Sequence, residues 1–172
     1  MALETAYIQE KMTQKFGNKV LNFSMSRDVF SFEATSDAIY EVIRTLKTEE
    51  DLNFHFLTDL CGVHYPDNEV DQQFCVVYHL HNWVENTRIR IKTYLNGAQP
   101  EVATISDIFL SSNWMERETY DFYGIIFTGH PQLKRILNMD EMVSFPMRKE
   151  FPMEDNGRTD KDDRFFGRTA NC

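Results

Sequence analysis

The sequence predicts an α+β protein, a two-layer domain in which a sheet is covered on one face by helices. Apolar residues recur with helical spacing in two N-terminal stretches and with strand spacing in several others. The resulting order, α-β-β-α-β-β-β, has no regular βαβ alternation, which favours an α+β sheet. The composition is that of a folded chain, because 42% of the 172 residues are hydrophobic and 26% are charged.

The N-terminal elements follow from spacing and from stop signals. Residues 2–16 place apolar side chains near one helical face, and Gly17 ends this first helix. Residues 20–23 and 29–32 are short strands joined in a hairpin. Ser36 or Thr35 is expected to cap a second helix that runs to about residue 47. Its apolar positions recur at i, i+3, i+4 and i+7, namely at Ile39, Val42, Ile43 and Leu46.

Three further strands are expected at residues 54–61, 74–80 and 88–95. In the last of these, apolar residues alternate with the outward cations Arg88, Arg90 and Lys92. This first part, residues 1–103, forms the α+β domain.

Residues 104–152 are expected to be a helical and extended docking segment. Helical turns are predicted at 105–110, and a stronger helix at 113–122 that ends at Gly124. Pro131, Pro146 and Pro152 prevent a long helix beyond it. Residues 153–172 form a polar tail that we expect to order on partners.

Charge and cysteine content exclude several classes of protein. The net charge is −9, and no cluster of Lys and Arg suited to neutralising phosphates is present, so nucleic acid is not an expected partner. Cys61, Cys75 and Cys172 show no C-x-x-C spacing, which indicates a reducing compartment and no thiolate-bound cluster. Neither a signal peptide nor an apolar stretch of about 20 residues is found. We therefore expect a cytoplasmic-type chain that reaches membranes through partners.

One polar helix could hold an acid-base site. Trp114, Glu118 and Asp121 fall on one face at i, i+4 and i+7, where the indole could raise the pKa of a carboxyl group. His130 follows in a loop. The alternative, which we favour, is that Arg117 and the acids form structural or intersubunit ion pairs.

Metal and nucleotide sites have weaker support. His79 and His81 would share one face of a strand near Cys61 and His64, but no zinc spacing is present, and interface or hydrogen-bonded histidines are the favoured interpretation. The chain contains neither G-x-G-x-x-G nor G-x-x-x-x-G-K-[ST]. We predict no catalytic, cofactor-binding or metal-binding residues.

The stretch Pro146-Met147-Arg148-Lys149-Glu150-Phe151-Pro152 has the character of an interface anchor. Proline fixes φ and removes a donor, so the chain is expected to lie extended over a surface. Arg148, Lys149 and Phe151 mix charge and apolar area as interface residues do. The alternative is a surface connection packed on its own domain.

Four groups of residues resemble a known family, because they follow one another in a fixed order. These groups are Glu116-Arg117-Glu118, Asp121-Phe122-Tyr123-Gly124, Gly129-His130-Pro131 and Leu133-Lys134-Arg135-Ile136-Leu137. Together with residues 146–152, they are similar to the thirty-kilodalton subunit family of respiratory complex I, the bacterial proton-pumping NADH:quinone oxidoreductase. Residues 143–145 depart from it, since the family usually has a glycine shortly before Pro146.

The resemblance implies a cofactor-free structural subunit of the hydrophilic arm. It would lie beside the large quinone-site subunit and the iron-sulfur subunits, at the cytoplasmic face of the bacterial inner membrane. The complex passes electrons from NADH through FMN and iron-sulfur centres to quinone and couples this to proton translocation, while the isolated chain is expected to be non-catalytic. The implied interface residues are Glu116, Arg117, Glu118, Asp121, Gly124, His130, Pro131, Arg135, Pro146, Arg148, Lys149, Phe151 and Pro152.

Two alternatives stay open at this point. One is an equivalent docking subunit of a membrane-bound hydrogenase or a photosynthetic quinone oxidoreductase, which carry similar domains. The more remote one is a stand-alone acid-base enzyme that uses Glu118, Asp121 and His130.

Overall fold

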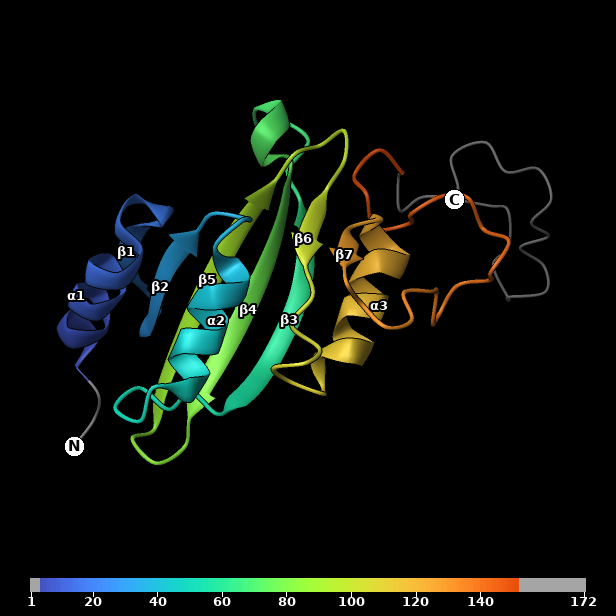
Figure 1. Cartoon of the computed structure of the whole chain (residues 1–172). Coiled ribbons are helices and arrows are strands. Elements are labelled where there is room, and N and C mark those ends of the chain that lie inside the picture. The colour runs from blue at the N-terminus through green and yellow to red at the C-terminus, as the bar shows by residue number, and fades with distance from the viewer. Residues whose placement is uncertain (1–3, 152–172) are drawn as a thin grey trace, which may run out of the picture.

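The computed structural model describes residues 4–151, which form an α+β domain followed by an irregular segment (Figure 1). The predicted fold class is confirmed. Pro152, residues 153–172 and Cys172 lie outside the described residues. The elements, in chain order, are α1 (Thr5–Phe16), η1 (Gly17–Lys19), β1 (Val20–Ser26), β2 (Val29–Ala34), α2 (Ile39–Thr48), β3 (Phe56–His64), η2 (Val70–Gln72), β4 (Phe74–Asn82), β5 (Thr87–Leu95), β6 (Glu101–Ala103), α3 (Ser112–Tyr123) and β7 (Ile126–Thr128).

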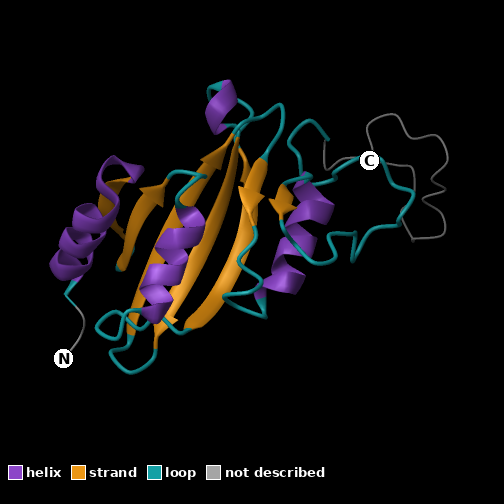
Figure 2. Cartoon of the chain, viewed as in Figure 1, coloured by secondary structure: helices purple, strands orange, loops and turns teal. Residues whose placement is uncertain are grey.

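The main sheet has the strand order β1-β2-β5-β4-β3 (Figure 2). Neighbouring strands are antiparallel except β2 and β5, which pair in parallel. The edge strand β3 borders α3, so the sheet and the last helix meet along one side.

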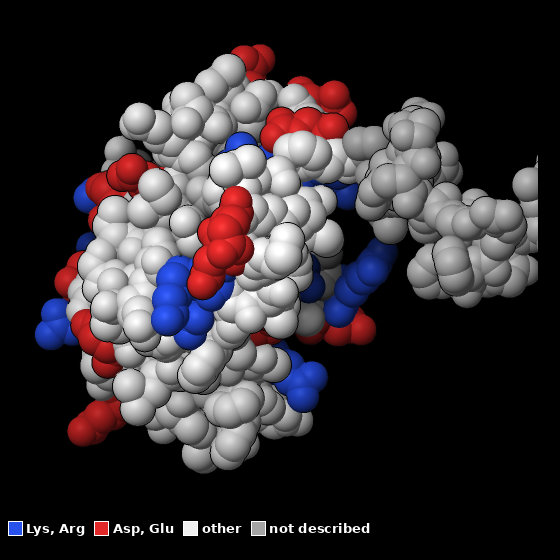
Figure 3. All heavy atoms as spheres, turned by 90° about the vertical axis from the view of Figure 1, so that its right-hand side faces the viewer, with Lys and Arg blue, Asp and Glu red and all other residues white. Residues whose placement is uncertain are grey.

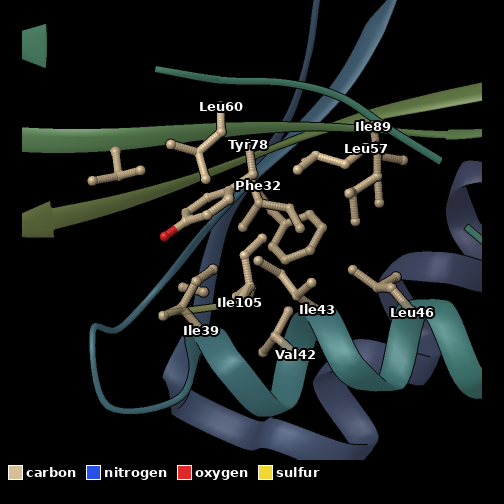
Figure 4. Packing of buried hydrophobic residues seen from close by; sticks show 14 of the residues in the cluster. Phe32, Ile39, Val42, Ile43, Leu46, Leu57, Leu60, Tyr78, Ile89 and Ile105 are labelled. Carbon is tan, nitrogen blue, oxygen red and sulfur yellow. The ribbon is translucent and has the colours of Figure 1, made fainter. Parts of the chain in front are cut away.

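The hydrophobic core lies between the sheet and α2 (Figure 4). Ile39, Val42, Ile43 and Leu46 are fully buried, as the helical spacing predicts. They pack in one cluster with inward residues of the sheet, among them Phe32, Leu60, Tyr78 and Ile89, and with Ile8 and Met12 of α1.

Residues beyond position 103 also belong to this core. Ile105, Ile125 and Phe127 are buried in the same cluster as the sheet residues. The short strands β6 and β7 pair in parallel and join the chain before α3 to the chain after it. The division between residues 103 and 104 stays a prediction, and this pairing crosses it.

Two local expectations were wrong. Neither Thr35 nor Ser36 caps α2 with its side chain; a turn intervenes, Ala38 occupies the N-cap position, and the Ile39 N–H donates to the Thr35 carbonyl at 3.0 Å. The third strand begins at Phe56 and not at residue 54, because Asn53 has a left-handed φ of 43° that interrupts the extended backbone.

Candidate docking site on α3 and residues 129–151

Helix α3 carries the polar motif, and its ends are fixed by the surrounding chain. The Ser112 hydroxyl donates to the Phe109 carbonyl at 2.8 Å, and the Gly124 N–H donates to the Tyr120 carbonyl at 2.8 Å. Gly124 adopts a left-handed φ of 73°, so the predicted C-terminal stop is confirmed.

Glu116 faces into the domain and is fully buried. One carboxylate oxygen accepts from the Ile105 N–H at 2.8 Å, and the other accepts from the Thr104 hydroxyl. Burial raises the pKa of this carboxyl group above its ordinary value, although the hydrogen bonds oppose the shift. Glu116 therefore ties α3 to the chain that leaves β6.

His130 lies beside Glu116 with a defined tautomer. Its Nδ1 accepts from the Gln132 N–H at 3.0 Å, so the ring proton is on Nε2, which lies 3.1 Å from the Asn113 carbonyl and 3.9 Å from Glu116. The imidazole thus holds the loop after β7 against the first turn of α3.

Asp121 and Arg135 form the centre of the site. Asp121 is fully buried, and Arg135 donates to one of its carboxylate oxygens at 2.7 Å. The other oxygen accepts from three successive backbone N–H groups, those of Ile136, Leu137 and Asn138, at 3.1, 2.8 and 2.9 Å. Although burial opposes it, these hydrogen bonds and the guanidinium hold the pKa of Asp121 far below its ordinary value.

Arg117 completes the attachment of the loop to α3. Its guanidinium donates to the carbonyls of Lys134 and Arg135 at 3.1 and 3.0 Å and stacks on the Trp114 ring. Arg135 also donates to the Ser144 carbonyl at 3.0 Å. Residues 129–144 are consequently fixed to the helix by polar contacts and little regular structure.

Arg148 closes the site at the C-terminal end of α3. It donates to the Tyr123 carbonyl at 2.7 Å, and its guanidinium lies between the rings of Phe74 and Phe145, 4.9 and 4.7 Å from their centroids. A Cβ atom on Gly124 would approach Arg148 and Phe145 to 2.6 Å each. Only glycine allows this close approach.

The next residue is tied to the sheet. The Lys149 N–H donates to Nδ1 of His64 at 3.0 Å, and the His64 ring stacks on Phe74 at 4.5 Å. Burial lowers the pKa of His64, which favours the neutral ring that accepts this bond. The sequence analysis missed this role of His64, because nothing in the spacing links it to a residue 85 positions away.

The proposed acid-base residues do not form one constellation. Asp121 is saturated with hydrogen bonds, His130 is engaged with Asn113 and Glu116, and Glu118 points outward. Trp114 is 61% exposed and stacks on Arg117, so it desolvates neither carboxylate of its face.

The histidines considered for a metal have other partners. Nε2 of His79 accepts from Arg90 at 2.9 Å, while His64 is bound to Lys149. Within residues 4–151, no group of three potential ligands is placed to hold a metal ion. In that same range, no helix is both long and apolar enough to cross a membrane.

The outer side of this segment exposes apolar side chains. We call these residues the apolar strip; they are Leu137, Met139, Val143, Met147 and Phe151, which are 64, 73, 93, 49 and 40% exposed. Lys149 and Pro131 are exposed as well, and Pro146 is half-buried. The face seen from the side of α3 has wide areas without charged side chains around one compact group of acidic and basic residues (Figure 3). Such exposed apolar area is typical of interaction surfaces.

Fold and site together define an α+β domain with a C-terminal segment held on its last helix by buried Arg and Asp side chains. Comparison with known proteins gives this class a family. Residues 32–157 match the family model of the respiratory-chain NADH dehydrogenase 30 Kd subunit. The chain therefore belongs to this family.

Named relatives agree with that assignment. The chain is 41% identical over 139 residues to a C-type NADH-quinone oxidoreductase subunit of Rhizobium meliloti, and the match covers 80% of this chain and 74% of that protein. It is 35% identical over 168 residues to the C-type NADH-quinone oxidoreductase subunit of Roseiflexus sp., covering 96 and 95%. The solved trypsin-resistant fragment of Nqo5 superposes with a TM-score of 0.63 at 26% identity, covering 76% of this chain and all of that one.

Proposed function

We propose that this chain is the structural docking subunit of an NADH:quinone oxidoreductase of the complex I type. The observation that carries the proposal is the internal anchoring of residues 129–151. Asp121, Arg135 and Arg148 hold this segment against α3 from within, and the apolar strip on its outer side is free to meet a neighbouring subunit. The family assignment gives that neighbour a setting.

In this proposal the motif residues have two kinds of role. Glu116, Arg117, Asp121 and Arg135 are buried, so they position the segment and do not touch a partner themselves. Gly124 allows the close approach of Arg148. The direct contacts come from exposed residues, among them Lys149, Phe151 and Pro131.

The partners we propose are the large quinone-site subunit and the iron-sulfur subunits of the hydrophilic arm, at the cytoplasmic face of the bacterial inner membrane. FMN, iron-sulfur clusters and quinone would be held by those subunits, and this chain would bind no cofactor. Supporting this, ring nitrogens of the candidate ligands His64 and His79 already accept hydrogen bonds from Lys149 and Arg90.

Variants of residues 148 and 149 test the proposal. Lys149→Ala and Arg148→Ala should lower the amount of assembled complex and its NADH:quinone reductase activity in equal proportion, because both residues serve assembly and neither serves chemistry. Arg27→Ala, an exposed cation in the turn at the far edge of the sheet, is the matched control. Normal assembly with lost activity would contradict the docking role.

Glu118→Gln separates docking from the acid-base alternative. Glu118 is exposed, so we expect unchanged assembly and unchanged reductase activity, with a change in stability within about 0.5 kcal/mol. A catalytic activity of the isolated chain that disappears in this variant would support the enzyme and count against our proposal.

A further inference from the structure

The face of the sheet opposite the core carries a row of cations on β5. Arg88, Arg90 and Lys92 alternate with Ile89 and Ile91, which are fully buried in the core, so the three cations point to the other side. Successive members of this row are separated by two residues, or about 6.8 Å along the strand. We call this row the basic row.

No described helix covers this face. The buried residues of α1 and α2 belong to the core cluster, and α3 packs on Gly62, which has the same orientation in β3 as the core residue Leu60. The cluster contains the inward residues of β4 and excludes Cys75 and Val77, which point to the side of the basic row. For residues 4–151 the core therefore lies on one side of the sheet alone.

The basic row also lacks acidic partners. Elsewhere in the chain Lys11, Lys15 and Lys19 form ion pairs with Glu49, Asp51 or Asp37. Arg88 and Lys92, by contrast, have no carboxylate within ion-pair distance among residues 4–151.

The neighbouring acids of this face are turned to other groups. Glu33, opposite Lys92 on β2, accepts from the Asn22 amide at 2.7 Å. Asp59 lies 3.8 Å from Nδ1 of His79. Arg90 donates to Nε2 of the same ring, so His79 is a neutral spacer and the positive charge stays on the row.

We propose that the basic row docks an acidic segment of a second neighbouring subunit, on the face of the sheet away from the core. Carboxylates at alternate positions of an extended chain repeat at the same spacing as Arg88, Arg90 and Lys92, so each cation meets one carboxylate. Three cations are too few for a nucleic-acid surface, which makes about 6 to 10 phosphate contacts. In a chain of net charge −9, they are the surface suited to an acidic partner.

This inference rests on the proposed function, and it adds a second contact to it. The apolar strip lies beside α3, whereas the basic row lies on the far face of the sheet. The chain would then bridge two subunits, one held mainly by apolar area and one mainly by charge. Charge-held contacts weaken as salt rises, and apolar contacts do not.

Charge reversal in the assembled complex tests the basic row. We would compare Arg88→Glu/Lys92→Glu with Arg27→Glu/Arg44→Glu, which makes the same change in net charge at exposed cations elsewhere. Arg90 is left in place because it bonds His79. The first double variant should lower the yield of assembled complex about tenfold at physiological salt, with partial recovery at low salt, and the control should leave it unchanged.

Zero-length carbodiimide cross-linking of the native complex gives a second measurement. Lys92 is expected to form an amide with an Asp or Glu of another subunit. A link to Glu33 alone, or to residues 152–172 of its own chain, would overturn the proposal. So would normal assembly of the reversed variant, including the case in which that variant loses binding to heparin as a nucleic-acid-like polyanion. Absence of the wild-type chain from any complex would instead refute the proposed function itself.

Discussion

Gly124 shows how one residue couples a helix to the segment that follows it. Its left-handed φ and the 2.6 Å approach of Arg148 and Phe145 make two separate demands, and glycine alone satisfies both. The sequence shows a glycine after a helix, which predicts the stop. It does not show that a guanidinium comes from 24 residues further on to occupy the space of the missing side chain.

Gly124→Ala should cost about 2 to 4 kcal/mol, the sum of backbone strain and overpacking. Gly17→Ala is the matched control, since Gly17 also has a positive φ of 57° but no atom within 4 Å of its Cβ position. That control should cost only about 1 to 2 kcal/mol. Urea unfolding of the two variants measures the difference, and equal losses would show that the contact with Arg148 is unimportant.

Asp121 gives a prediction for pH. The folded chain lowers the pKa of this carboxyl group below its unfolded value of about 3.9. A lowered pKa means that the stabilisation is fully present above the unfolded value and is lost as the pH falls below it. Asp121→Asn should remove this part of the acid dependence and cost about 3 kcal/mol at neutral pH, because Arg135 loses its counter-charge.

Unfolding free energies measured from pH 7 down to pH 2 test this prediction. The wild-type protein should lose more stability than the variant below about pH 4. Parallel curves for the two proteins would mean that Asp121 is not the group that titrates. Arg135→Met, which removes the guanidinium and keeps an apolar stem, should reduce the same difference.

At the scale of elements, strands and helices with long periodic patterns were predictable. In α2 all four apolar positions are fully buried, and the alternation in β5 separates Ile89 and Ile91 from the cations. The strands β6 and β7 were not found, because three residues are too few to show a period.

The site was predictable in position and not in its internal contacts. The motif residues do lie on α3 and in the segment after it. Their partners are mostly backbone groups, such as the carbonyls of Lys134 and Arg135 and the three N–H groups that surround Asp121. Backbone groups carry no sequence signal, so the spacing of side chains could not reveal a network that uses them.

The apolar strip is the element that we expect to meet the first partner. Met139→Ser should change the stability of the isolated chain by no more than about 0.5 kcal/mol, because this side chain is 73% exposed. The same variant should weaken assembly by burying a polar group in the interface. Met25→Ser, at 61% exposure on β1 at the other edge of the sheet, is the control. Blue-native gels of membranes from both strains compare them, and equal assembly would remove the strip from the interface.

The whole molecule is a rigid spacer with surfaces of different character on its sides. One sheet with one core fixes the distance between the apolar strip beside α3 and the basic row on the far face. Such a body suits a subunit that sets the relative position of its neighbours. It also explains why the most strongly perturbed carboxyl, Asp121, is bound to the chain's own backbone and is not available for chemistry.

The most direct test of the docking role is to tag this chain at its native level, solubilise the membranes in mild detergent and identify what co-purifies. We predict recovery with subunits of the hydrophilic and membrane arms, together with flavin and iron-sulfur absorbance. The same subunits without flavin would point to a related hydrogenase-type machine. Recovery of the chain alone from the soluble fraction would contradict the account.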